Sequence, residues 1–211
     1  MAMSSAKENI LKKIRQALIN PVPVPFPLSE GTDSVFKPAK QEAEVEFAEN
    51  FTKLQGRFVF CVNETELAQQ LDALAKSRNW QKVYCQEPEL RSMLQQHGYD
   101  QLNAPDVHTC DAAITGCEWL VARTGSILMS SAQPSGRITS VYGQVHICIA
   151  YTDQLLYDIK EALQQVKDKY EQLPSLVTLA TGPSRTADIE KTLVVGVHGP
   201  KEVFCFLVER S

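Results

Sequence analysis

The sequence has no block of lysine or arginine. Its 21 basic and 25 acidic side chains are spread along 211 residues and leave a net charge of −4. A protein that follows a phosphate backbone needs clustered positive charge, so we expect no nucleic-acid partner. No apolar run approaches the roughly 20 residues that cross a bilayer, and the N-terminus lacks the apolar core of a signal peptide. We therefore predict a cytoplasmic location and no membrane span.

The cysteines and histidines lack the spacing of metal ligands. There are six cysteines and four histidines but no Cys-x-x-Cys pair, and the closest cysteines, Cys110 and Cys117, are separated by six residues. Iron–sulfur clusters and zinc need grouped thiolates or paired nitrogen and sulfur ligands. We therefore predict no metal and no cofactor in this chain, with most cysteines acting as small buried hydrophobic residues. The glycine motifs of common nucleotide-binding and hydrolase sites are also absent.

The first 40 residues differ in composition from the rest of the chain. Apolar residues at helical spacing predict an amphipathic helix over 4–19, and alternating prolines at 21–27 predict a stiff, extended spacer. A polar loop is expected at 28–40, so the compact domain would comprise residues 41–211. The helix of this N-terminal arm would either pack on its own domain or dock on a partner subunit, and the sequence leaves both open.

From Gln41 onward, helical and strand-like segments alternate. Strands that alternate with helices predict an α/β fold, with a mostly parallel sheet flanked by helices. The 44% hydrophobic content is sufficient for a substantial core. Helices are expected at 42–54, 64–78, 88–97, 117–123, 153–169 and 187–191, and strands at 57–62, 82–85, 107–115, 126–130, 144–150, 176–180, 193–195 and 203–209.

Three loops rich in Gly, Ser and Thr form the candidate site, because ligands of open α/β sheets bind beyond the carboxyl ends of strands. The first loop joins the strand expected at 176–180 to the helix expected at 187–191. The guanidinium of Arg185 and the free N–H groups of the helix start would hold an anion. The alternative is a well-capped turn with Arg185 paired to a carboxylate. The candidate residues of this loop are Thr181, Gly182, Ser184, Arg185 and Thr186.

The second and third loops add hydroxyl groups and a histidine. Thr115, Thr124 and Ser126 flank the short helix expected at 117–123, and Gly125 should end that helix in the left-handed conformation. His198 lies in a loop that two glycines and a proline define tightly, where it would donate to a ligand oxygen or transfer a proton. Helix capping would also explain the second loop, and a backbone hydrogen bond would also explain His198. No catalytic residue is assigned.

These loops, taken in order, resemble a known family. The run TGPSRTADIE at 181–190, followed by GVHGP at 196–200, resembles the closing signature of the lactate utilisation protein C group of LUD-domain proteins. The run ITGCEWLVARTGSIL at 114–128 resembles the family's central segment, and residues 10–18 are similar to its N-terminal helix. The resemblance covers most of the chain. Arg123 departs from it, since family members usually carry an acidic residue before the central Thr-Gly.

The resemblance implies a fold similar to that of the NagB/RpiA/CoA-transferase superfamily and a role in oxidising L-lactate to pyruvate. It implies two iron–sulfur partner proteins that carry the clusters, with this chain as a non-redox subunit that binds a small anionic ligand. Whether the chain is itself an enzyme stays open. Two alternatives are a stand-alone enzyme for a sugar phosphate, CoA ester or folate, and a purely structural module. Arg123 favours anion binding at its position over acid–base or metal chemistry.

Overall fold

A computed structural model describes residues 6–19, 38–39, 41–186 and 194–210, and the chain divides into two units, Met1–Pro38 and Ala39–Ser211. The first unit contains helix α1 (Ala6–Ile19), which confirms the helix predicted there over the residues described. The proline-rich spacer at 21–27 lies outside the described residues, as does most of the loop that follows it. No described helix is long and apolar enough to cross a membrane.

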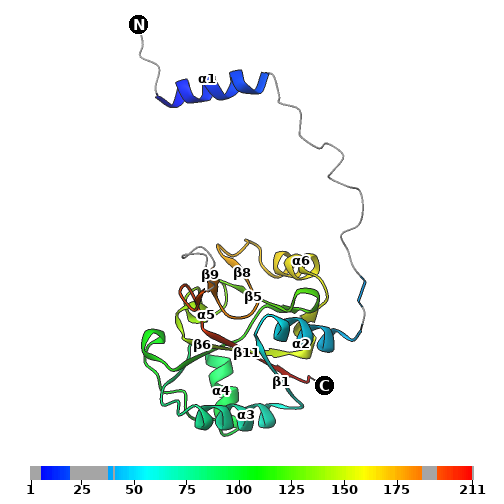
Figure 1. The fold of residues 1–211 in the computed structure, drawn as a ribbon, viewed down its shortest axis with the longest axis vertical. Helices are drawn as coiled ribbons and strands as arrows, with labels where there is room; N and C mark the ends of the chain where they lie inside the picture. The colour runs from blue at the N-terminus through cyan, green and yellow to red at the C-terminus, as the bar shows by residue number, and fades with distance from the viewer. Residues whose placement is uncertain (1–5, 20–37, 40, 187–193, 211) are drawn as a thin grey trace. The chain divides into compact units, whose positions relative to one another are not determined.

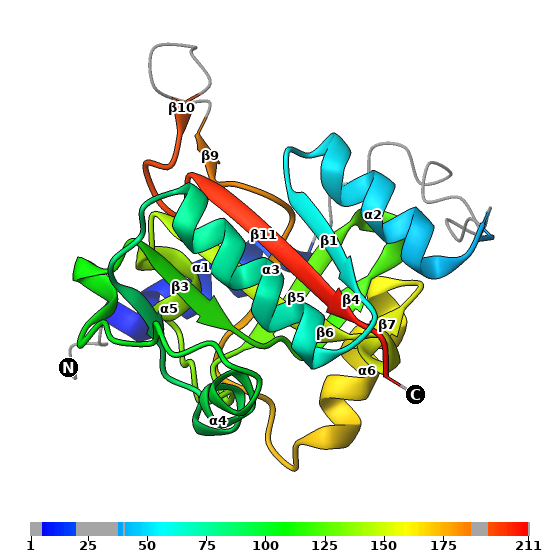
Figure 2. The same ribbon diagram turned by 90° about the horizontal axis from the view of Figure 1, so that it is seen from below.

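The second unit is built on a five-stranded sheet in which every neighbouring pair is parallel (Figures 1 and 2). The mostly parallel sheet predicted from the sequence is therefore confirmed, although its strand order does not follow the chain. The order across the sheet is β1 (Arg57–Cys61), β11 (Glu202–Val208), β6 (Val145–Tyr151), β3 (Ala112–Thr115) and β2 (Val83–Cys85).

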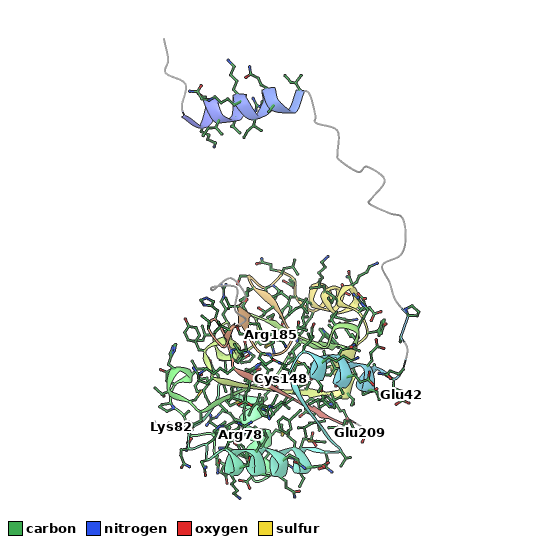
Figure 3. All side chains as sticks on the ribbon, viewed as in Figure 1. Glu42, Arg78, Lys82, Cys148, Arg185 and Glu209 are labelled. Atoms are coloured by element: carbon green, nitrogen blue, oxygen red, sulfur yellow. The ribbon has the colours of Figure 1, made fainter. Side chains whose placement is uncertain are left out.

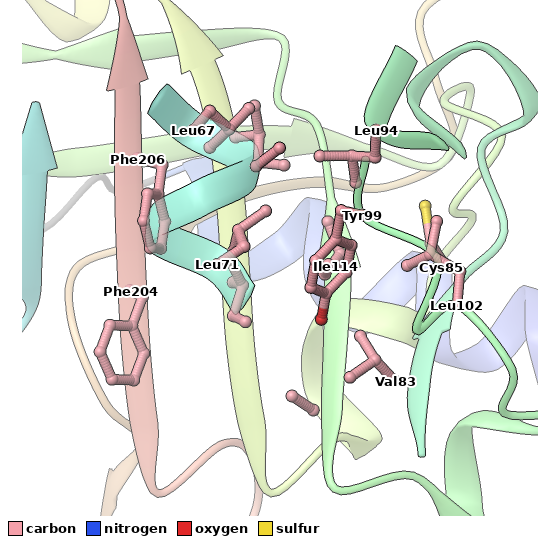
Figure 4. Close-up of a cluster of buried hydrophobic side chains, with 14 of the residues drawn as sticks. Leu67, Leu71, Val83, Cys85, Leu94, Tyr99, Leu102, Ile114, Phe204 and Phe206 are labelled. Atoms are coloured by element: carbon pink, nitrogen blue, oxygen red, sulfur yellow. The ribbon is translucent and has the colours of Figure 1, made fainter. Parts of the chain in front are cut away.

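Helices α3 (Glu64–Ser77) and α4 (Pro88–Gln96) cover one face of this sheet. Asn63 caps α3 by accepting a hydrogen bond from the backbone N–H of Glu66 at 2.9 Å. Figure 4 shows Leu67 and Leu71 of α3 beside Phe206 of β11, and all three side chains are buried. Each such side chain stabilises the fold by about 1.5–3 kcal/mol through burial.

A second, four-stranded sheet covers the opposite face and was not predicted from the sequence. Its order is β7 (Leu155–Leu156), β4 (Trp119–Val121), β5 (Ser126–Ser130) and β8 (Val177–Ala180), with antiparallel pairs except between β7 and β4. Helix α2 (Ala43–Lys53) shares this layer, and its Phe47 and Phe51 are buried between the sheets. Helix α6 (Ile159–Lys169) packs on the outer face of the second sheet.

Two of the predicted helices are wrong, because strand pairing and helix capping determine the local structure more strongly than the helical spacing of apolar residues does. Residues 117–123 form strand β4 and a 3-10 turn at Ala122–Thr124, since Trp119–Val121 pair with β5. The helix expected at 153–169 begins only at Ile159. Asp158 is its N-cap and accepts from the N–H of Lys160, while the residues before it form a 3-10 turn at Thr152–Gln154 and strand β7.

The remaining differences concern short segments. The strand expected at 107–115 is confined to β3, because Asp106 caps a 3-10 turn at Val107–Thr109. A short helix, α5 (Thr139–Tyr142), was not expected. The helix expected at 187–191 lies outside the described residues. On either side of it, β9 (Arg185–Thr186) and β10 (Val194–Val195) pair as an antiparallel ribbon.

Candidate functional site

Two of the three predicted loops meet around one cavity. Thr181, Gly182 and Ser184 of the first loop and His198 of the third line a cavity of about 300 Å³, which we call the loop cavity. His146, at the start of β6, lines the same cavity. Four of the predicted residues therefore share one space.

Backbone contacts fix the two loops against each other. The N–H of Ser184 donates to the carbonyl of Pro200 at 3.0 Å, and the N–H of Gly196 donates to the carbonyl of Ser184 at 2.9 Å. Gly182 has φ +86°, and a Cβ there would lie 2.4 Å from the carbonyl oxygen of Leu54. Only glycine fits both the conformation and the space, so this turn is built for close backbone approach.

The second loop reaches the first through a chain of hydroxyl groups. Oγ1 of Thr124 lies 2.8 Å from Oγ of Ser126, which lies 3.1 Å from Oγ1 of Thr181. Gly125 has φ +60° and follows the 3-10 turn, so its predicted left-handed conformation is confirmed, although it ends no α-helix. A Cβ on Gly125 would lie 2.4 Å from the backbone nitrogen of Phe51. This loop therefore supports the cavity wall from behind and packs on α2.

Thr115 is connected to the loop cavity through His146. Oγ1 of Thr115 lies 2.8 Å from Nε2 of His146, and both residues are buried between the two sheets. Burial lowers the pKa of His146 to about 4. The imidazole is therefore neutral near pH 7 and offers the cavity a polar group without a charge.

The two arginines expected to attract an anion are engaged with the protein itself. Arg185 is exposed and donates to the carbonyl of Leu54, and the adjacent Thr186 belongs to β9. Nε of Arg123 lies 2.6 Å from Oδ2 of Asp158, which makes Arg123 a partner of the helix cap. The described lining of the loop cavity holds no arginine or lysine, so any anion there would depend on hydroxyl groups and His198.

The expectation that all three loops lie at the carboxyl ends of parallel strands is wrong. The first loop follows β8 of the second sheet, and the third precedes β11. The carboxyl edge of the parallel sheet holds another cavity, of about 390 Å³, which we call the carboxyl-edge cavity. Residues just beyond β2, β3, β6 and β11 contribute to its lining, among them Glu87, Gly116, Gln154 and Arg210.

Glu87 is a half-buried carboxylate in this cavity. Its Oε1 accepts the N–H of Gly116 at 2.8 Å, and the hydroxyl of the buried Ser135 also hydrogen-bonds to it. Burial has the largest influence and raises the pKa of Glu87, with the negative charges of Glu118 and Glu89 adding to the effect and the two hydrogen bonds opposing it. The carboxylate keeps acceptor capacity for a further donor.

Arg210, which follows β11, also lines this cavity and contacts the 3-10 turn at Thr152–Gln154. The guanidinium of Arg210 lies 4.7 Å from the ring centre of Tyr151 and donates to Oδ2 of Asp153 at 3.1 Å. Oε1 of Gln154 accepts the N–H of Tyr151 at 2.9 Å, while Nε2 donates to the carbonyl of Cys117 at 2.9 Å. Gln154 thus ties the end of β6 to the turn after β3, and the cavity walls are held by direct contacts.

Another acidic residue, Glu118, is buried and stabilises the fold. Its carboxylate accepts from Oγ of Ser130 at 2.5 Å, Oη of Tyr170 at 2.7 Å and Nζ of Lys169 at 2.7 Å. Burial alone would raise the pKa of Glu118, but these hydrogen bonds together outweigh it and lower the pKa. A carboxylate this fully bonded is a poor nucleophile.

All six cysteines are free and buried, as predicted for most of them. Figure 3 labels Cys148 within the main body of the protein. Burial raises the pKa values of Cys61, Cys85 and Cys110 to about 11. Over the residues that the structure describes, no three His, Cys, Asp or Glu side chains gather as metal ligands would.

The chain is similar in sequence and in structure to known proteins. The family model described as "LUD domain" matches residues 45–208, most of the chain. The chain belongs to the LUD domain family. This LUD-domain chain is also similar in structure to a DUF162 family protein from Deinococcus radiodurans, with a TM-score of 0.59 over 82% of this chain and 99% of that one. Their sequences are 20% identical, so this likeness concerns the fold.

Curated relatives of this LUD-domain chain carry one recurring name. "Lactate utilization protein C" of Oceanobacillus iheyensis is 33% identical over 102 residues, covering 47% of this chain and 44% of the relative. The protein of the same name from Deinococcus radiodurans is 32% identical over 108 residues, covering 51% and 50%. An uncharacterised protein of Neisseria meningitidis is 34% identical over 93 residues, covering 44% and 40%. The chain thus spans about half the length of these relatives or less.

His146 of the loop cavity was not predicted as a site residue. The other residues that were not predicted line the carboxyl-edge cavity: Glu87, Tyr151, Gln154 and Arg210. Each of these four lies at or just beyond the end of an apolar run, and this position is the feature of the sequence that could have indicated it. That signal is weak, because the sequence alone does not show which strand ends are neighbours.

Proposed function

We propose that this LUD-domain protein serves lactate utilisation as a non-redox subunit that acts in the cytoplasm beside two iron–sulfur proteins and binds a small anion. The observation that carries the proposal is the combination of a LUD domain over residues 45–208 with relatives that bear the name lactate utilization protein C. The fold adds cavities of a size suited to a small ligand.

The environment of the thiols supports the assignment of the iron–sulfur clusters to the partner proteins. Iron–sulfur ligation uses grouped thiolates, and among the described residues no three His, Cys, Asp or Glu side chains are placed to hold a metal ion. The six cysteines also serve as core residues, so their chemistry is that of packing. Electron transfer is accordingly assigned to the partners.

The alternative of a CoA transferase gains no support from the acidic residue of the central segment. Such an enzyme needs a glutamate that can attack an acyl group. Glu118 is buried, and its carboxylate is engaged by Ser130, Lys169 and Tyr170.

Reconstitution tests the proposal. The two iron–sulfur proteins, with their cluster content verified by absorbance and iron analysis, are mixed with L-lactate and an artificial electron acceptor, with and without this chain. We expect acceptor reduction to depend on the chain and to saturate at a fixed ratio of the three proteins. An undiminished rate when the chain is omitted would contradict the proposed role.

A further inference from the structure

The loop cavity contains a buried histidine whose hydrogen bonds are incomplete. His146 is 1% exposed and lines the cavity, and its Nε2 lies 2.8 Å from Oγ1 of Thr115. Among the described residues, no further atom hydrogen-bonds to either side chain. The Nδ1 atom of His146 therefore has no protein partner in the described part of the chain, and a ligand in the cavity is in a position to provide one.

The buried hydroxyl of Thr115 determines which nitrogen of His146 carries the hydrogen. Within the residues that the structure describes, this hydroxyl has no acceptor for its hydrogen other than Nε2 of His146. If Nε2 donated instead, the hydroxyl hydrogen would be buried without a partner, which is costly. Since a neutral imidazole carries a single N–H, the ring hydrogen lies on Nδ1. The cavity thus presents a buried N–H donor that lacks an acceptor.

Charged side chains are absent from the described walls of the loop cavity and of the hollow beside it. The second hollow, of about 340 Å³, shares Val141 and His198 with the loop cavity, so the two spaces adjoin. No Asp, Glu, Lys or Arg is among the described residues that line them. An ion placed there would lose hydration without gaining a partner of opposite charge, which disfavours anions and cations alike. The two spaces therefore suit an uncharged ligand.

The body of such a ligand would meet apolar and aromatic surfaces. Met129, Val141 and Val203 line the loop cavity, and Tyr142 and Val197 line the adjoining hollow. The side chains of Val141, Tyr142 and Val197 are exposed, so they offer apolar contact area that the described fold leaves uncovered. An aromatic ring buries a large apolar area and packs well against another ring such as that of Tyr142. These walls therefore favour an aromatic ligand.

We propose that the loop cavity binds an uncharged aromatic amide, with the carbonyl oxygen of the amide accepting from Nδ1 of His146. The hydroxyl groups of Thr181 and Ser184 line the same cavity and can accept the N–H of the amide. The ring then lies toward Val141 and the adjoining hollow. The inference goes beyond the proposed function, because this ligand is uncharged and is distinct from the small anion assigned there.

Ligand-observed NMR titration of the full chain at pH 7 with benzamide, benzoate and benzylamine is the direct test. The three probes share one ring and differ in a head group that is neutral, negative or positive. We expect benzamide to bind with a dissociation constant in the millimolar range, as its small size implies. Benzoate and benzylamine should bind at least about tenfold more weakly, because the described walls offer no opposite charge.

Two variants locate the bound probe. His146→Phe keeps a ring but removes the donor, so benzamide should bind about tenfold more weakly; its control is His97→Phe, which removes an imidazole bonded to Thr65. Because His146 is a core residue, Val141→Trp provides a second variant at an exposed position, where the larger side chain should fill the space and abolish binding. Its control is Val45→Trp, at an exposed position of α2. Circular dichroism verifies that each variant is folded.

Two-bond ¹H–¹⁵N NMR spectra of the protein with labelled histidine test the hydrogen-bond argument without a ligand. We expect His146, identified by the signal that His146→Phe lacks, to carry its hydrogen on Nδ1 at pH 7. A hydrogen on Nε2, equal affinity for the three probes, undiminished benzamide binding in either folded variant, or no benzamide binding at millimolar concentration would each overturn the assignment. The reconstitution assay judges the role in lactate utilisation separately, so the two failures are distinguishable.

Discussion

Replacing Glu118 by glutamine removes the charge from a buried carboxylate that accepts three hydrogen bonds. The side chain is inaccessible, and Ser130, Tyr170 and Lys169 all donate to it at 2.5–2.7 Å. Hydrogen bonds to a charged group contribute about 1.5–3 kcal/mol each, against about 0.5–1.5 kcal/mol for neutral pairs. The Lys169 bond is discounted, because 53% of that side chain is exposed to solvent.

The hydrogen bonds from Ser130 and Tyr170 therefore determine how much stability the variant loses, and we expect the free energy of unfolding to fall by about 2–4 kcal/mol. For a chain of this size, that corresponds to a decrease in Tm of about 5–15 °C. Urea titration followed by far-UV circular dichroism at pH 7 measures the difference. Lys169→Met is the matched control and should cost about 1 kcal/mol or less. A loss below about 1 kcal/mol for Glu118→Gln, or equal losses for the two variants, would refute the reasoning.

The same variant has a defined pH dependence. Because the pKa of Glu118 is lowered on folding, its ionisation stabilises the fold above the ordinary value of 4.5. This contribution is lost as the pH falls through the folded pKa. The stability difference between the parent protein and Glu118→Gln should thus be constant from pH 8 to pH 6 and narrow below about pH 4.5. A difference that widens on acidification would contradict this assignment.

Three further predictions follow from local geometry. Gly125→Ala should destabilise the fold by more than about 2 kcal/mol, because its Cβ would contact the backbone of Phe51. Gly98→Ala also requires a positive φ but has open space around it, so it should cost about 1 kcal/mol. Chemical denaturation compares the free energies of unfolding of the two variants. His146 is buried and neutral, and its pKa lies below the ordinary value of 6.5, so the free energy of unfolding should decrease by up to ~3 kcal/mol as the pH falls from 6.5 to 4. His146→Gln should not show this part of the pH dependence. The six thiols should react with Ellman's reagent only in denaturant, because all six are buried in the native protein. Rapid labelling of the native protein would contradict this burial.

The elements that the sequence predicted well carry strong local signals. Helix α3 begins after Asn63, a good N-cap, and α4 ends before Gly98, which has φ +90°. Leu155 and Leu156 show the limit of such reasoning. They continue the helical period of α6, but pairing with β4 and the Asp158 cap make them a strand. Tertiary contacts decided between two locally acceptable structures.

The candidate site was harder to predict because it depends on which strand ends are neighbours. Thr181, Ser184 and His198 were predicted as site residues because glycine- and hydroxyl-rich loops are visible in the sequence, and the structure places them around one cavity. Glu87 and Arg210 are far apart in the chain and follow ordinary apolar runs. They line one cavity only because of the order in which β2, β3, β6 and β11 form the sheet.

The place of β11 in that order has a consequence for how the chain acquires its structure. β11 follows the other strands in sequence, yet it lies between β1 and β6, and it is the only strand that pairs with β1 in the described sheet. Arg57 pairs with Phe204, so almost the whole domain must be synthesised before β1 gains a partner. Such distant pairing slows folding. A nascent chain that lacks β11 would expose the edges of β1 and β6 together. Until β11 is synthesised, association with a chaperone or a second nascent chain competes with folding.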